Sequence, residues 1–155
     1  YKRQLSAIPR QYRPAVFRVG ENRYVAPMDI ISALFIENID LRQVEGPSTR
    51  IDLTGIQFSL TAQNPVPVTV EPHLCVIVHC PPDHKGSAAL EVVYMRDGQQ
   101  IARNVQPLQV EPGKFNYRLV RAELEFTEYG RIEAHCRVDL GPTTVVPLTL
   151  LPPVD

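Results

Sequence analysis

Two stretches of alternating apolar and polar residues follow one another between Arg118 and Leu140. The apolar positions of the first stretch share one parity, and they are Val120, Ala122, Leu124 and Phe126. The apolar positions of the second stretch also share one parity, and they are Ile132, Ala134, Cys136, Val138 and Leu140. A period of two is typical of a strand with one buried face, and Thr127 to Gly130 between the stretches have the composition of a turn. The pattern predicts a β-hairpin whose apolar face packs against a second sheet.

The chain from Met28 onward contains further strand patterns at short, regular spacing. We expect strands at residues 29–39, 51–60, 68–80, 90–95, 100–105 and 145–150, with a loop at 42–50. The segment 68–80 is apolar on both parities, which favours the centre of a sheet. Gly55 indicates a bulge or a close backbone approach, and Asp97-Gly98 predicts a tight hairpin turn. The expected fold is all-β, a single antiparallel β-sandwich of about seven or eight strands over residues 28–155.

Composition agrees with one globular domain. The chain has 155 residues, of which 44% are apolar and 21% are charged, values that exclude wholesale disorder. Fifteen prolines argue against long helices. No apolar run approaches the roughly 18 residues of a membrane span. Because the sequence begins with Tyr1 and not with methionine, we expect that residues upstream of it are missing from this sequence.

Charge is distributed unevenly along the chain. Residues 1–27 carry six Lys or Arg and one Glu, a net charge of +5, which leaves −6 for residues 28–155. Three prolines interrupt the basic segment, and its apolar residues follow no sustained period, so we expect an extended N-terminal arm that does not fold alone. The arm supplies our candidate partner-binding residues: Arg10, Tyr12, Arg13, Phe17, Arg18, Arg23 and Tyr24.

Short motifs from Met28 onward resemble an uncharacterised family of small bacterial proteins, a domain of unknown function. The motifs are Met28–Leu34, Ile51–Ile56, Arg96–Gln99, Leu124–Phe126 and Val146–Leu150. The resemblance covers residues 28–151 and excludes the arm. It implies an immunoglobulin-like sandwich and no activity.

Histidine and cysteine residues are the candidate metal ligands. His73, Cys75 and His79 share one face of a strand, and His135 is expected on a neighbouring strand. The preferred interpretation is structural, with Cys75 as a small buried residue and no bound metal or cofactor. Cys80 and Cys136 both follow the apolar parity, so an inter-sheet disulfide is an alternative. The odd cysteine count and the lack of a glycosylation sequon favour three free thiols and a cytoplasmic location.

Catalytic motifs are missing from the sequence, which has no Gly-rich phosphate loop and no nucleophile elbow. The acidic residues of the 118–140 region alternate with arginines, which is typical of a solvated sheet face. We therefore expect a non-enzymatic structural or interaction module that docks through its arm to a protein partner or to copies of itself. An accessory nucleic-acid-binding role is the alternative, although the acidic body would repel a polyanion. Small-ligand or carbohydrate binding is a third interpretation, with no tryptophan for stacking.

Overall fold

The computed structural model of the chain describes residues 17–19 and 23–155. Within these residues all regular secondary structure is β, in fourteen strands, and no helix is present. The all-β class expected from the sequence is confirmed. The strands form several sheets and outnumber the seven or eight that we expected.

The largest sheet has five strands in the order β10-β9-β13-β14-β6. Their bounds are Gln99–Gln109 for β10, Ser87–Arg96 for β9, Gly130–Val138 for β13, Thr144–Leu151 for β14 and Ser59–Thr61 for β6. Neighbours are antiparallel except for β14 and β6, which run parallel. The expectation of a purely antiparallel fold is therefore wrong at this edge, because β6 and β14 are far apart in the chain and no hairpin turn joins them.

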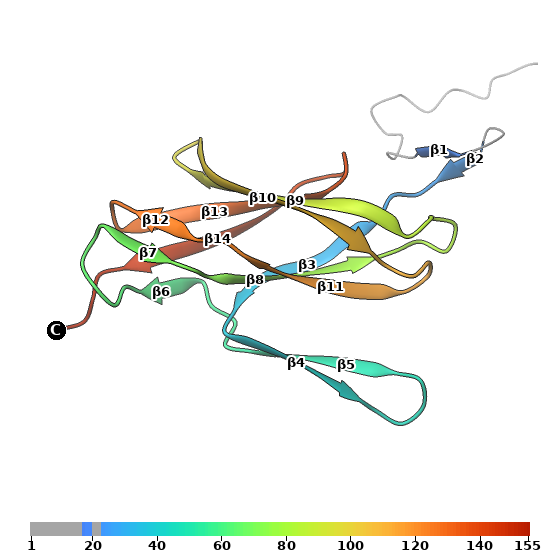
Figure 1. Ribbon diagram of the computed structural model, residues 1–155, viewed down its shortest axis with the longest axis horizontal. Helices are drawn as coiled ribbons and strands as arrows, with labels where there is room; N and C mark the ends of the chain where they lie inside the picture. Colours follow the sequence, from blue (N-terminus) through green and yellow to red (C-terminus); the bar gives the residue numbers. More distant parts are fainter. Residues whose placement is uncertain (1–16, 20–22) are drawn as a thin grey trace, which may run out of the picture.

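A three-stranded sheet faces the five-stranded sheet across the core, as Figure 1 shows. It has the order β11-β8-β3, with bounds Phe115–Arg121, His73–His79 and Asp29–Ile36. The central position of β8 agrees with the prediction for the apolar segment 68–80, but that segment is not one strand, because residues 68–70 form a separate strand in another sheet. Alternate residues of both sheets, together with Leu124 and Phe126 from a separate short strand, meet in one cluster of buried side chains. The largest of the others are Tyr94, Phe35, Leu74, Leu90, Leu108, Ile132, Leu148 and Leu150.

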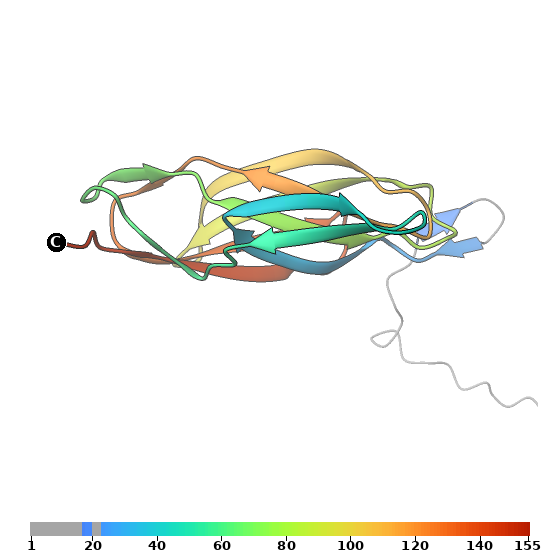
Figure 2. The same ribbon diagram turned by 90° about the horizontal axis from the view of Figure 1, so that it is seen from below.

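Three two-stranded sheets complete the described fold. They pair β1 (Phe17–Val19) with β2 (Arg23–Val25), β4 (Asn38–Gln43) with β5 (Thr49–Thr54), and β7 (Val68–Val70) with β12 (Leu124–Phe126). The β4–β5 hairpin lies over the outer face of the three-stranded sheet and forms a third layer, as Figures 1 and 2 show. The loop expected at 42–50 is thus shorter, because only residues 44–48 separate the two strands.

The hairpin predicted between Arg118 and Leu140 is wrong. The two halves join different sheets, since β11 pairs with β8, β12 pairs with β7, and β13 pairs with β9 and β14. Alternation reports which face of a strand is buried but not which strand lies beside it, so the pattern could not exclude a chain that crosses between sheets. The predicted burial is confirmed for five residues, Val120, Leu124, Ile132, Cys136 and Val138. Leu140, in contrast, is 78% exposed, because β13 ends at Val138.

Two local predictions about glycines agree with the structure. The Asp97-Gly98 turn joins β9 to β10, and both residues have positive φ, 49° and 77°, as a type I′ turn requires. Gly55, with φ of 67°, interrupts the expected strand 51–60 after Thr54. A Cβ atom at Gly55 would lie 2.5 Å from carbons of the exposed Glu37 side chain, which is flexible enough to move, so the positive φ is the feature that favours glycine here.

Candidate interaction surfaces

The described part of the arm is a short hairpin at one end of the molecule, next to the start of β3 (Figure 1). Phe17 and Arg18 lie on β1, Arg23 and Tyr24 lie on β2, and Arg18 and Tyr24 are register partners. The other three candidate residues, Arg10, Tyr12 and Arg13, lie outside the described residues. Val25 and Met28 are buried, so the final residues before β3 are packed onto the body.

The four candidate metal ligands are not brought together. His73, Cys75 and His79 lie on the outer face of β8, because the alternate residues between them belong to the core. His135 lies on β13 in the other sheet, where its ring is 3.2 Å from Glu133, so the expectation that it neighbours β8 is wrong. The described residues contain no group of three or more His, Cys, Asp or Glu arranged to hold a metal ion.

All three cysteines are free and buried. Burial raises the pKa of the Cys136 thiol to about 12 and also raises the pKa of Cys75 and of Cys80. Thiolates are the reactive form of cysteine, and burial in apolar surroundings disfavours them here. The three side chains therefore serve packing, with Cys80 and Cys136 in the core cluster between the sheets.

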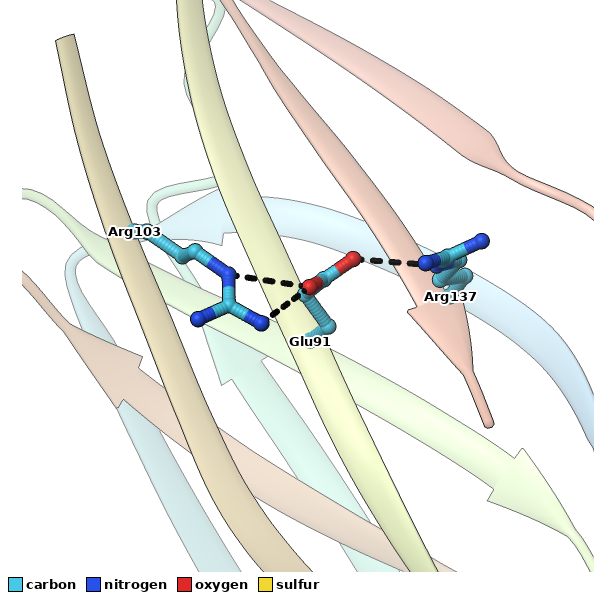
Figure 3. A network of polar contacts seen from close by, with 3 residues as sticks. All are labelled: Glu91, Arg103 and Arg137. Atoms are coloured by element: carbon cyan, nitrogen blue, oxygen red, sulfur yellow. Dashed lines mark hydrogen bonds and ion pairs between the residues drawn. The ribbon is translucent and has the colours of Figure 1, made fainter. Parts of the chain in front are cut away.

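The outer face of the five-stranded sheet carries an ordered charge network, shown in Figure 3. Glu91 on β9 accepts hydrogen bonds from Arg103 Nε and Nη2 at 2.9 and 2.7 Å, and from Arg137 Nε at 2.9 Å. These arginines come from the strands on either side, β10 and β13, and they lower the pKa of Glu91, with the Arg103 hydrogen bond as the largest cause. The network connects three charged side chains across three neighbouring strands on the outer face of the sheet.

A second charged group lies further along β13. Glu133 accepts a hydrogen bond from Arg131 Nη2 at 2.9 Å and contacts His135, and these partners lower its pKa, with the His135 contact as the largest cause. Glu123 and Glu125 belong to the β11–β12 region and not to this face. The shared polar face expected for the 118–140 region is therefore divided between sheets.

The outer face of the three-stranded sheet, in contrast, is apolar. One row of register partners across it is Leu34, Cys75 and Leu119, and the next row is Ser32, Ile77 and Tyr117. Cys75 and Ile36 are each 1% exposed although they do not belong to the core cluster. Another part of the chain must cover them, and the overlying β4–β5 hairpin has the position to do so (Figure 2).

The β4–β5 hairpin has one apolar and one charged face. Register partners Ile39 with Leu53 and Leu41 with Ile51 form the apolar face. Asp40, Asp52, Arg42 and Arg50 share the other face, where Arg42 Nε donates to Asp52 at 2.6 Å. At the base of the hairpin the amide of Glu37, between β3 and β4, donates hydrogen bonds to Thr54 O and Gly55 O, and the Gln57 amide donates to Phe35 O of β3 at 2.9 Å. The apolar face is the less exposed one, which indicates that it is turned toward the sheet.

This third layer was not predicted from the sequence. Ile39 and Leu41, and then Ile51 and Leu53, alternate with polar residues, which is the signal of a strand pair with one apolar face. We assigned most of this region to a loop because of Gly46-Pro47-Ser48, but those residues only form its turn.

Comparison with known proteins adds no family assignment, because no family model matches the chain and no curated protein matches it. Within the described residues, no helix is long and apolar enough to cross a membrane.

Proposed function

We propose that this chain is a non-enzymatic interaction module that assembles with copies of itself through its N-terminal arm, residues 1–27. The observation that carries the proposal is the division of charge, +5 on the arm and −6 on the body. Each copy thus carries both partners of an electrostatic contact, and complementary charges favour association and orientation. A symmetric exchange of arms would use the same contact twice and close as a dimer.

The described strands support an arm that is available to a neighbour. β1 pairs with β2, and neither forms a ladder with a strand of the body. Both views place this hairpin at the end of the molecule and not over a sheet face (Figures 1 and 2). Arginine and tyrosine, the residue types of the arm, are those that most often dominate protein interfaces.

We also propose that the body is an immunoglobulin-like sandwich. In that class strands B and E are neighbours in one sheet, and C, F and G are neighbours in the other. The pairs β8 with β11, and β9 with β13 and β14, occupy corresponding positions in chain order. The body departs from the class in having free cysteines and a buried tyrosine, Tyr94, but no tryptophan on β9. Such sandwiches serve many functions, so this proposal adds nothing about activity.

The test of assembly is the light-scattering mass of the full chain beside two variants with the same change in net charge. Arg10→Glu/Arg13→Glu alters the arm, and Lys85→Glu/Arg121→Glu alters exposed cations of the body as the control. We expect the full chain and the control to form dimers that weaken as NaCl is raised, and the arm variant to be monomeric. A monomeric full chain that binds generic duplex DNA with steep salt dependence would contradict self-assembly and favour nucleic-acid binding.

A further inference from the structure

Exposed apolar side chains gather at the end of the molecule where the arm joins the body. Phe115 is 60% exposed on β11, and its register partner on β8, His79, is in turn the partner of Asp29 at the start of β3. The His79 and Phe115 rings are 4.7 Å apart. Ile31, at the β-bulge two residues after Asp29, is 56% exposed and lies on β3, the edge strand opposite β11. These residues form the uncovered end of an otherwise apolar outer sheet face.

The tip of the β4–β5 hairpin extends toward the same end. In both views the tip lies on the side of β1 and β2, and in Figure 1 the hairpin diverges from the sheet in that direction. Leu41, near the tip, is 53% exposed, whereas Ile39 at the base is half-buried. Coverage of the outer face is thus complete at the base, over Ile36 and Cys75, and incomplete toward the tip.

Acidic side chains flank this surface. Asp29 belongs to the same row as Phe115, and Glu45 lies in the turn at the tip of the hairpin. Neither forms an ion pair with a described residue. The surface therefore combines apolar side chains with flanking carboxylates, which is complementary to a segment that interleaves aromatic residues with arginines.

The arm has that composition and the necessary length. Residues 1–16 contain Tyr12 between Arg10 and Arg13, and Tyr1, Leu5 and Ile8 precede them. Sixteen extended residues reach about 50 Å, roughly twice the length of a seven-residue strand such as β8. The arm of a neighbouring copy is therefore long enough to span the uncovered end of the outer face.

We propose that the surface formed by Ile31, Leu41, Phe115, Asp29 and Glu45 receives residues 1–16 of a second copy of this chain. The inference rests on the proposed function and names the receiving site of the arm. The second copy is the occupant because β1 and β2 pair only with each other among the described strands and lie past the start of β3. The apolar and aromatic residues of the segment match the exposed Ile31, Leu41 and Phe115, and its arginines match the carboxylates of Asp29 and Glu45.

The first experiment uses two phenylalanines of equal exposure. Phe115→Asp alters the receiving surface, and Phe58→Asp is the matched control, because Phe58 is also 60% exposed but precedes β6 in the other sheet. Circular dichroism checks that both variants fold, and Leu41→Asp repeats the test on the hairpin. We expect Phe115→Asp and Leu41→Asp to raise the dimer dissociation constant at least about tenfold, and Phe58→Asp to leave it unchanged within a factor of two.

The outcomes separate this inference from the proposed function. If Arg10→Glu/Arg13→Glu abolishes the dimer but Phe115→Asp does not, arm-mediated assembly stands and the receiving surface is wrong. A full chain that is monomeric at every concentration overturns both. A photo-crosslinking phenylalanine analogue at position 115, in a mixture of ¹⁵N-labelled and unlabelled chains, then identifies the occupant. We expect cross-links between labelled and unlabelled chains within residues 1–16; cross-links only within one chain, or to another segment, overturn the inference.

Discussion

Leu124→Ala tests whether the side chains of β12 are buried in the core. Leu124 is 1% exposed and belongs to the core cluster, where β12 pairs with β7. The substitution removes three carbon atoms, and at about 0.8 kcal/mol for each buried methylene the lost transfer free energy is about 2.4 kcal/mol. A residual cavity adds to this, so we expect the free energy of unfolding to fall by about 2.5 to 5 kcal/mol.

Leu140→Ala is the matched control. Leu140 has the same apolar parity in the sequence pattern, but it is 78% exposed. Its truncation should change the free energy of unfolding by less than about 0.5 kcal/mol. Urea unfolding followed by circular dichroism measures both variants. With a slope of about 2 kcal/mol per molar urea, Leu124→Ala shifts the midpoint by at least about 1 M. Equal effects of the two substitutions would refute the assignment of β12 to the core and the end of β13 at Val138.

Three further predictions concern the polar and sulfur groups. Hydrogen bonds from Arg103, and then Arg137, lower the folded-state pKa of Glu91 below its usual 4.5. The contribution of the Glu91 carboxylate to folding stability is therefore complete above the unfolded-state pKa and is lost as the pH falls through the folded-state pKa. Glu91→Gln should therefore cost up to about 1 kcal/mol at pH 7 and progressively less as the pH falls below 4.5, and a cost that does not change with pH would contradict the pairing. Among the described residues the buried Tyr94 hydroxyl has no hydrogen-bond partner, so Tyr94→Phe should leave the urea midpoint unchanged or raise it, whereas a loss above about 1 kcal/mol would show that the hydroxyl is satisfied. Thiol titration should detect three groups after unfolding without reductant and almost none in the native protein, because all three cysteines are buried. One group after unfolding would contradict three free thiols and favour a Cys80–Cys136 disulfide.

The elements that the sequence predicted well are those whose physical signal is local. Asp97-Gly98 determined its turn because only a few residue types adopt positive φ at both positions. The apolar character of both parities in β8 reflected coverage on two faces, by the core and by the β4–β5 hairpin. The pairing of Arg118–Leu140 failed because the partners of β11 and β12 lie some 40 to 60 residues earlier in the chain, where no local pattern records them.

The polar groups show the same limit. Arg103 and Arg137 are 12 and 46 residues from Glu91, so the network depends on the order of β10, β9 and β13 and could not be predicted before that order was known. His135 was expected beside β8 and lies in the other sheet for the same reason. The partner-binding residues of the arm, including Arg10, Tyr12 and Arg13, stay predictions that depend on charge and composition.

Mixing two defective variants tests the contact between arm and body most directly. Arg10→Glu/Arg13→Glu has a defective arm and an intact receiving surface. Phe115→Asp has an intact arm and a defective receiving surface. If arms are exchanged between copies, each variant alone is monomeric at the chain mass of 17.5 kDa. The equimolar mixture retains one intact contact per pair, so its light-scattering mass rises toward twice that value. A mixture that stays at the mass of one chain, under conditions where the unmodified chain is dimeric, contradicts the account.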